Sequence, residues 1–367
     1  MKERCVALLG RSDEPTDAVL EYCEYLRDAL QQEGIALELF RVRWPELGWR
    51  RALNELREKV TCYPGAWFIL QYTALTWSRR GFSWRVLSVL RILKKSGARC
   101  AIMFHDSEGY PGNRLVDRVR RVVQIRTMRR SLQLADLTIL NVPPENLPWL
   151  PAGSRNTVLI PVGANLPSPE RAWSQEPIPE ELPPRVAIFS LSTGRAGEEE
   201  IQTIAEAASY TAHKAGGLCL VMLGRNSEAG AILLKGKLAG APVQIDVRGL
   251  LPADEIVRVL ASCNVMLFVR GPISSRRGSA IAGIACGLPI VAQEGWETGW
   301  PITEAGVVLV PEASEEGFGP ALLRVLSDKS YRALLAERSR KAQERYFSWP
   351  AIADQYAQVL RKNERNP

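Results

Sequence analysis

A strand–loop–helix–strand pattern between residues 265 and 292 constrains the fold of this chain more than any other segment. The apolar run 265–269 predicts a buried strand, residues 278–286 a helix of small side chains, and residues 289–292 a second apolar strand. Two strands joined through a helix run parallel, so the segment predicts a unit of a parallel sheet. Such sheets bind ligands at the loops that leave the carboxyl ends of their strands.

The loop inside this unit combines hydroxyl groups, guanidinium groups and the start of a helix. Its candidate ligand-binding residues are Ser274, Ser275, Arg276, Arg277, Gly278 and Ser279. Free backbone N–H groups at a helix start, beside two guanidinium groups, suit a phosphate group. The alternative interpretation is an ordinary surface loop whose arginines are solvated or ion-paired.

The alternation of short apolar strands with helices continues through both halves of the chain. Strands are expected at residues 4–9, 35–42, 66–71, 99–104, 137–141 and 157–161, and then at 185–189, 218–223, 243–247 and 307–310. Alternation of this kind is typical of α/β folds with parallel sheets. We therefore expect two similar α/β domains, each with a doubly wound parallel sheet.

A proline-rich segment separates the two halves. Residues 166–184 have many prolines and little apolar periodicity, which predicts a semi-rigid linker. The expected domains are accordingly residues 1–165 and 185–348. A terminal helix within residues 349–367 is expected to pack back on the first domain.

The composition is that of a soluble globular protein, with 46% hydrophobic and 24% charged residues among 367. A net charge of +7 favours anionic partners such as nucleotides, nucleic acid or an anionic membrane surface. No apolar stretch is long enough to span a bilayer, and the N-terminal sequence lacks the features of a signal peptide. The seven cysteines are scattered, which predicts reduced core residues, as in Cys5, Cys100, Cys219 and Cys263, of a cytoplasmic protein. We expect no metal site, because the chain has only two histidines and no cluster of ligand residues.

Six segments follow one another in the order found in a known enzyme family. They are A-I-M-F-H-D (101–106), V-L-I-P-V-G-A-N-L (158–166), V-A-I-F-S-L-S-T-G-R (186–195), L-C-L-V-M-L-G-R-N (218–226), V-R-G-L-L-P-A-D-E-I-V-R-V-L-A-S-C-N-V-M-L-F-V (247–269) and A-G-I-A-C-G-L-P-I-V-A (282–292). Through these segments nearly the whole chain resembles glycosyltransferases of the GT-B fold, in particular the retaining family 4. The resemblance implies two Rossmann-like domains that face a central cleft.

The resemblance also implies roles for particular residues. Arg195, after Gly194, matches the family arginine that meets the donor diphosphate, and residues 274–279 match the donor loop. His105 and Asp106 match a strand end that delivers a His–Asp pair to the cleft, so both are candidate catalytic residues; a structural capping pair is the alternative. Gly10 and Arg11 occupy the turn where the family has a glycine-rich loop, although a plain turn is an equal alternative.

The chain departs from the family at three positions. Ser274 and Ala282 stand where the family has two glutamates, one that meets the donor sugar and one that holds the ribose. The family lysine that follows the arginine is also missing, because its position falls near Glu200. We hypothesise that Arg276 or Arg277 supplies the missing charge, since fixed cations and helix N-termini can stabilise a leaving diphosphate without a metal ion.

A strongly basic helix is expected from about residue 112 or 113 to residue 134. Apolar side chains alternate there with Arg114, Arg118, Arg120, Arg121, Arg126, Arg129 and Arg130. A basic amphipathic helix suits docking on an anionic membrane surface, and the alternatives are nucleic-acid binding or packing on the core with a solvated face. Further aromatic and basic residues could extend such a surface, namely Trp77, Arg79, Arg80, Phe82 and Trp84.

The leading functional hypothesis is a retaining, metal-independent hexosyltransferase without a cofactor. Its substrates would be a nucleotide-diphosphate sugar and a glycan or lipid-linked acceptor in polysaccharide or glycolipid synthesis. It would work in the cytoplasm or on the inner face of the membrane. The alternatives are a catalytically degenerate GT-B scaffold that binds a nucleotide sugar or a partner protein, and a GT-B epimerase. Nucleic-acid binding rests on charge alone and is not expected.

Overall fold

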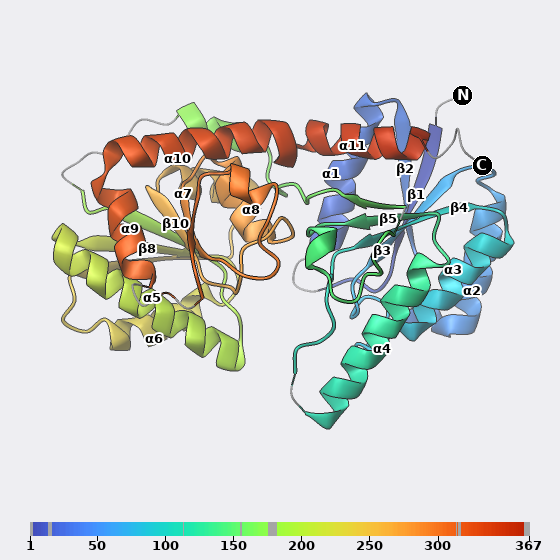
Figure 1. Ribbon diagram of the computed structural model, residues 1–367, viewed down its shortest axis with the longest axis horizontal. Coiled ribbons are helices and arrows are strands. Elements are labelled where there is room, and N and C mark those ends of the chain that lie inside the picture. Colours follow the sequence, from blue (N-terminus) through green and yellow to red (C-terminus); the bar gives the residue numbers. More distant parts are fainter. Residues whose placement is uncertain are drawn as a thin grey trace. The chain divides into compact units, whose positions relative to one another are not determined.

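The computed structural model describes residues 3–13, 17–112, 114–154, 156–174, 182–312, 314 and 317–362. The chain forms two compact units (Figure 1). The first unit comprises residues 1–161 and 349–367, and the second unit comprises residues 162–348. Each unit contains a parallel sheet covered by helices, which confirms the predicted α/β class.

The division between the units falls before the predicted linker, which was placed at residues 166–184. Residues 169–174 form a short helix, η3 (Pro169–Ser174), that belongs to the second unit. The indole N–H of Trp173 donates a hydrogen bond to the carbonyl oxygen of Ala285, 2.8 Å away, so this part of the proline-rich segment is anchored by an aromatic side chain. Residues 175–181 lie outside the described residues.

The sheet of the first unit has the strand order β2-β1-β3-β4-β5-β6, and all its strand pairs are parallel. The strands are β1 (Glu3–Leu9), β2 (Ile35–Arg41), β3 (Trp67–Tyr72), β4 (Arg99–Phe104), β5 (Leu137–Leu140) and β6 (Thr157–Leu159). The chain passes to opposite sides of β1, so the switch point of this sheet lies between β1 and β3. β3 and β5 are buried along their whole length, which accords with their largely apolar sequences.

Helices cover both faces of this sheet (Figure 1). They are α1 (Ala18–Gln32), α2 (Trp44–Thr61), η1 (Ser83–Arg85), α3 (Val86–Lys95), α4 (Leu115–Leu132), η2 (Pro144–Asn146) and α11 (Trp349–Lys362). α2 begins at Trp44, because Pro45 suits the first turn of a helix, and it bends at Gly48, whose φ is 72°. α11 packs on α1, where the hydroxyl groups of Tyr22 and Tyr356 are hydrogen bonded at 2.9 Å.

The second sheet has the order β12-β11-β10-β7-β8-β9 and is also parallel. Its strands are β7 (Arg185–Phe189), β8 (Leu218–Leu223), β9 (Val243–Gly249), β10 (Val265–Phe268), β11 (Ile290–Gln293) and β12 (Val307–Val310). Counted from β7, this is the 3-2-1-4-5-6 order of dinucleotide-binding folds, with its switch point between β7 and β10.

The helices of the second unit include one that the sequence pattern did not predict. They are α5 (Gly194–Ala215), α6 (Ser227–Lys237), α7 (Ala253–Ala261), α8 (Gly278–Ala285), η4 (Ile302–Glu304), α9 (Phe318–Ser327), α10 (Lys329–Ala342) and η5 (Gln343–Phe347). α6 was missed because it contains two glycines and leaves Ile232 and Leu233 exposed, so its apolar residues do not mark a buried face. The four cysteines expected in the core, Cys5, Cys100, Cys219 and Cys263, are buried and do not form disulfides.

Candidate functional site

The carboxyl ends of β10, β7 and β8 are neighbours at the switch point of the second sheet. The loops that leave them carry Arg270 after β10, residues 190–194 after β7 and Arg225 after β8. The backbone N–H of Leu191 donates to the carbonyl oxygen of Arg225 at 2.9 Å, and the N–H of Arg225 donates to Oγ of Ser190 at 3.1 Å. These bonds fix the two loops against each other at the edge where such sheets bind ligands.

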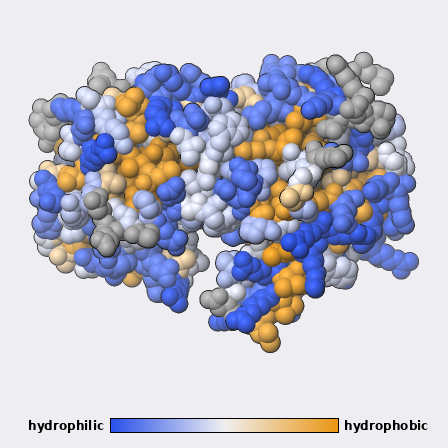
Figure 2. Space-filling view, in the orientation of Figure 1, coloured by the Kyte–Doolittle hydropathy of each residue, from blue (hydrophilic) through white to orange (hydrophobic). Residues whose placement is uncertain are grey.

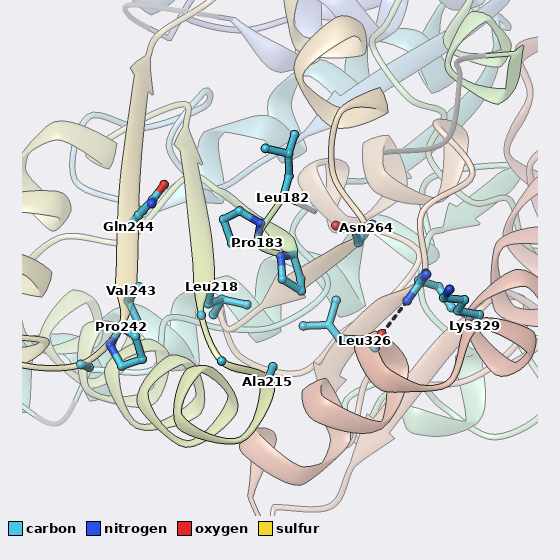
Figure 3. Close-up of a pocket in the computed structure, with 15 residues that line it drawn as sticks. Leu182, Pro183, Ala215, Leu218, Pro242, Val243, Gln244, Asn264, Leu326 and Lys329 are labelled. Carbon is cyan, nitrogen blue, oxygen red and sulfur yellow. Dashed lines mark hydrogen bonds between the residues drawn. The ribbon is translucent and has the colours of Figure 1, made fainter. Parts of the chain in front are cut away.

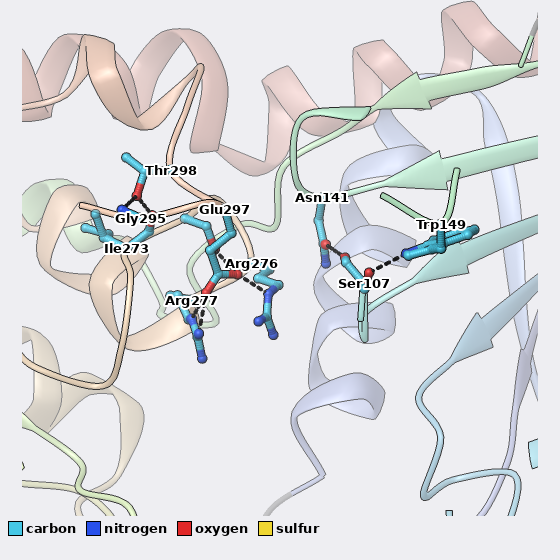
Figure 4. Close-up of polar contacts among 10 residues, drawn as sticks. Ser107, Asn141, Trp149, Ile273, Arg276, Arg277, Gly295, Glu297 and Thr298 are labelled. Carbon is cyan, nitrogen blue, oxygen red and sulfur yellow. Dashed lines mark hydrogen bonds and ion pairs between the residues drawn. The ribbon is translucent and has the colours of Figure 1, made fainter. Parts of the chain in front are cut away.

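A buried carboxylate, Glu297, organises the donor loop (Figure 4). Its side chain is 1% exposed and lies between the guanidinium groups of Arg276 and Arg277, with which it forms ion pairs. The hydroxyl of Ser274 also donates to Glu297 Oε2 at 3.0 Å. The two arginines are therefore held as a fixed pair that shares one negative charge, rather than as two solvated side chains.

Arg270 adds a third guanidinium group to this edge. Its Nε is buried and has no hydrogen-bond partner within the described ranges. Burial lowers the pKa of Arg270; the carboxylate of Glu200 opposes this shift and Arg225 adds to it. Burial, followed by the charge of Arg276, likewise lowers the pKa of Arg277. Arginine stays protonated even so, and the lowered pKa values show that the nearby carboxylates do not fully offset the cost of burying these cations.

Sequence reasoning missed both Glu297 and Arg270. Arg270 directly precedes the loop that was singled out, and its place at the end of an apolar strand was a usable signal. Glu297 follows β11 and is 20 and 21 residues from the arginines it binds, so only the pairing of β10 with β11 brings it to them. Glu200, where the family has a lysine, is also buried, and its carboxylate accepts a hydrogen bond from the N–H of Ser192 at 2.8 Å.

The other residues predicted to bind a donor lie at the same edge but differ in exposure. Gly194, with φ 63°, opens α5, and the Arg195 side chain is 91% exposed and paired with Glu199 one turn further on. Ser275 is buried, and its carbonyl oxygen accepts a hydrogen bond from the N–H of Val162 at 3.0 Å. Gly278 and Ser279 form the first turn of α8, as predicted from the sequence.

The predicted catalytic pair lies at the carboxyl end of β4 in the first unit. Nε2 of His105 is 2.8 Å from Oε1 of Gln71, and the edge of the ring packs against Tyr22. Burial lowers the pKa of His105 to about 4, so the ring is neutral at pH 7. The side chain of Gln71 therefore orients the imidazole.

Asp106 caps a neighbouring turn, since its Oδ2 accepts a hydrogen bond from the N–H of Ala74 at 2.7 Å. Ser107, the next residue, is buried and bonded through Oγ to Oδ1 of Asn141 at 2.9 Å, while its carbonyl oxygen accepts from the indole of Trp149 (Figure 4). This cluster is a neutral polar network behind the strand ends. Its members are almost fully buried, so it supports the strand ends from behind.

Gly10 and Arg11 form a closely packed turn at the switch point of the first sheet. The N–H of Arg11 donates to the carbonyl oxygen of Thr76 at 2.8 Å, and the carbonyl oxygen of Gly10 accepts from Arg41 at 2.8 Å. A Cβ atom at Gly10 would overlap the carbonyl group of Thr76. Glycine is therefore required here for close backbone packing.

Two further features of the structure bear on the site. Across the described parts of the chain, no three His, Cys, Asp or Glu side chains are grouped so that they could hold a metal ion. A cavity of about 730 Å³ in the second unit (Figure 3) is lined by residues such as Pro184, Leu218 and Val243. These precede or begin β7, β8 and β9, so the cavity lies at the amino edge of the sheet, opposite the loops described above, and none of the predicted site residues lines it.

Comparison with known proteins identifies the fold. No family model and no curated protein matches the chain. Among solved structures, a sucrose-phosphate synthase from Thermosynechococcus elongatus is 18% identical with a TM-score of 0.70, and a glycosyltransferase from Rickettsia africae is 12% identical with a TM-score of 0.71; each match covers 100% of both chains. Anabaena HepE in complex with UDP and glucose is 15% identical over 98% of this chain and 100% of its own, with a TM-score of 0.65. The chain thus has the two-domain GT-B fold, as the sequence segments suggested, whereas membership of family 4 stays a prediction.

Proposed function

We propose that this protein is a glycosyltransferase that takes a sugar from a nucleotide-diphosphate donor. One observation carries the proposal, namely the cluster of guanidinium groups at the carboxyl edge of the second sheet, beside its switch point. Structural neighbours support it, because one of them, HepE, is a complex with UDP and glucose.

The charges of this cluster suit a diphosphate. Four guanidinium groups face two buried carboxylates, which leaves two positive charges (four minus two). The residues are Arg225, Arg270, Arg276 and Arg277, with Glu200 and Glu297. The diphosphate of a nucleotide sugar carries two negative charges at neutral pH. When the bond between the anomeric carbon and the diphosphate oxygen breaks, a further negative charge develops on the leaving group, and fixed guanidinium groups stabilise it.

We propose that the same cluster replaces the lysine that the family has and this chain lacks. Arg270 supplies a buried cation with hydrogen-bonding capacity to spare, and Glu297 keeps Arg276 and Arg277 in place. Such an arrangement needs no bound metal ion, which accords with the proposed metal-independent, retaining transfer of a hexose. In the first unit, neutral His105 and the groups around it would bind the uncharged sugar or the acceptor.

The proposed acceptor is a glycan or a lipid-linked molecule, and the proposed location is the cytoplasm at the inner face of the membrane. Within the described residues, no helix is both long and apolar enough to cross a bilayer. Contact with a membrane would therefore be made from its surface, and α4 is the element whose composition suits it.

A second candidate function is a GT-B scaffold that binds a nucleotide sugar without transferring it. Ser274 and Ala282 supply no carboxylate where the family has its two glutamates, and Glu297 is occupied by two arginines. A site of this kind would hold the donor but lack groups that act on the sugar.

A donor screen with a matched pair of variants tests the proposal. Binding and hydrolysis of UDP-, GDP-, ADP- and dTDP-sugars are measured for the wild type, Arg270→Gln and Arg258→Gln, the last at an exposed position on α7. We expect Arg270→Gln to weaken binding of the preferred donor about 10- to 100-fold, because a charge-assisted hydrogen bond is lost, and Arg258→Gln to leave it unchanged. Turnover of any donor supports the transferase, and tight binding without turnover supports the scaffold. Equal donor affinity of both variants would contradict the assignment of Arg270.

A further inference from the structure

An ordinary surface helix buries apolar side chains and exposes polar ones, whereas helix α4 buries several polar side chains and exposes several apolar ones. Its buried positions include the polar residues Asp117, Gln124, Thr127 and Ser131. By contrast, Leu115 is 77% exposed and Val119 50%, and Val116 and Val122 are exposed as well. Figure 2 shows these apolar side chains as a stripe along the helix, bordered by hydrophilic residues.

Hydrogen bonds hold the helix in this orientation. The amide of Gln124 donates to the carbonyl oxygen of Gly81 at 2.9 Å and accepts from the N–H of Tyr110 at 2.6 Å. Asp117 is paired with Arg120 at 3.0 Å, and Arg120 lies over the ring of Tyr110. Rotation of the helix to bury its valines would break these contacts and leave buried polar groups unpaired, so the exposure of the apolar face is built into the first unit.

The exposed face changes character along its length. Residues 115, 119, 122 and 126 follow one another at helical spacing, so Arg126 continues the line that Leu115, Val119 and Val122 begin. Arg118 and Arg121 flank the apolar part and are exposed. The distance along the axis from Leu115 to Arg126 is about 16 Å, from the rise per residue of an α-helix. The exposed apolar side chains can enter the acyl boundary of a bilayer, and the cationic side chains that follow them can bind anionic headgroups.

The aromatic extension of this surface that the sequence suggested is only partly present. Trp77 was wrongly expected there, because it is fully buried and its indole donates to the carbonyl oxygen of Gln71. Trp84, in η1 next to α4, is 53% exposed beside Arg85. A tryptophan and an arginine in such a place are typical of the headgroup region of a bilayer.

We propose that α4 docks the first unit on the surface of an anionic lipid bilayer, with Leu115, Val119 and Val122 entering the acyl boundary and the neighbouring arginines binding lipid phosphates. Docking on a bilayer adds a partner to the proposed function. It depends on that function in one respect only, the lipid-linked acceptor that docking would bring within reach. A second copy of the chain fits this face poorly, because the arginines of the two copies would face and repel each other. Nucleic acid fits poorly as well, since exposed valines and leucine offer nothing to a phosphate backbone.

Vesicle flotation with paired variants tests the docking surface. Full-length protein is floated, without donor, with phosphatidylcholine vesicles that contain or lack phosphatidylglycerol. We expect binding only to the anionic vesicles, weakened roughly tenfold or more by the double change Leu115→Ser and Val119→Ser. The control is Ile232→Ser with Leu233→Ser, a pair of equally exposed apolar residues on α6, which should bind like the wild type.

A second pair of variants isolates the charge contribution. Arg118→Gln with Arg126→Gln should weaken anionic binding roughly tenfold or more, whereas Arg50→Gln with Arg51→Gln, exposed on α2, removes the same charge elsewhere and should have little effect. Equal losses from both charge variants, or equal binding to neutral vesicles, would overturn the proposal. So would sedimentation that shows a wild-type dimer and a monomeric Leu115→Ser, Val119→Ser variant, because the face would then be a protein interface. Donor hydrolysis in solution separates this outcome from the proposed function, since the α4 variants should retain it.

Discussion

The switch points of the two sheets are filled in different ways. In the first unit, between β1 and β3, backbone occupies the position, because the turn at Gly10 is hydrogen bonded to Thr76 and leaves no room for a side chain. In the second unit, between β7 and β10, the guanidinium group of Arg270 stands beside Glu200 and Arg225, with a buried Nε that lacks a partner among the described residues. Two sheets of similar build thus differ at this position, because backbone fills the first switch point and a buried guanidinium group lies at the second.

The contrast extends to the charged groups around each edge. His105 in the first unit is neutral and Asp106 caps a turn. In the second unit, buried carboxylates hold arginines in place but are too few to balance the positive charge of the guanidinium groups. The difference accords with the proposed binding of an anion in the second unit and of uncharged groups in the first. A parallel sheet supplies the edge, and the residues that follow each strand decide its chemistry.

The largest effect should come from removing the carboxylate that the arginines share. Glu297→Ala leaves Arg276 and Arg277 partly buried with no carboxylate between them, and loss of one partner of a buried ion pair costs about 3–5 kcal/mol. Hydrogen exchange of peptides from β10, β11 and α8 should therefore accelerate strongly, while peptides of the first unit keep their protection.

The matched control for Glu297 is Glu199→Ala, which removes the exposed partner of Arg195 on α5. An exposed pair of this kind contributes about 0–1 kcal/mol, so hydrogen exchange should change little. If Glu297→Ala behaved like Glu199→Ala, the second edge would not depend on a buried charge network, and the contrast between the two edges would fail.

A smaller effect is expected from pH, and only in the first unit. The pKa of His105 is about 4 in the folded chain, against 6.5 for an ordinary histidine, so the unfolded chain binds more protons between these limits. The stabilisation is complete above pH 6.5 and is lost as the pH falls towards 4, by up to roughly 3 kcal/mol. Urea unfolding of wild type and His105→Gln across this range measures it, because the variant should lose this part of the slope.

His213→Gln, at an exposed position on α5, is the matched control for the pH series. A wild-type slope that His105→Gln and His213→Gln leave equally intact would show that His105 is not held neutral by burial. The first edge would then resemble the second in carrying charge.

Much of this architecture could be predicted from the sequence, because strand signals are local. Apolar runs such as residues 218–223 and 307–310 gave strands with the observed bounds, and the loop at residues 274–277 does lie at a carboxyl edge. The ion pairs of Glu297 could not be predicted, since they depend on which strands are neighbours in the sheet and not on spacing along the chain. The place of Arg270 at a strand end could be read from the sequence, but its burial without a partner for its Nε among the described residues could not.

Helix α4 shows a different limit of sequence reasoning. Interpretation of helical periodicity assumes that apolar side chains face the core. Here the polar side chains Gln124, Thr127 and Ser131 are buried alongside Met128, whereas Val116, Val119 and Val122 are exposed. The composition predicted a basic amphipathic helix, but the orientation of its faces follows from hydrogen bonds to distant segments at Gly81 and Tyr110. An exposed apolar face of this kind violates the assumption on which a prediction from periodicity depends.

The smallest effect should come from one methyl group at the closed switch point. Gly10→Ala places a Cβ against the carbonyl group of Thr76, and overpacking of this kind costs about 1–3 kcal/mol. Faster hydrogen exchange in β1 and β3 measures the loss. Gly236→Ala is the matched control, because its Cβ meets no atom within 4 Å on α6 and alanine favours a helix by roughly 0.5–1 kcal/mol. If both substitutions were stabilising, the first switch point would have room for a side chain, and a ligand could bind there as well as in the second unit.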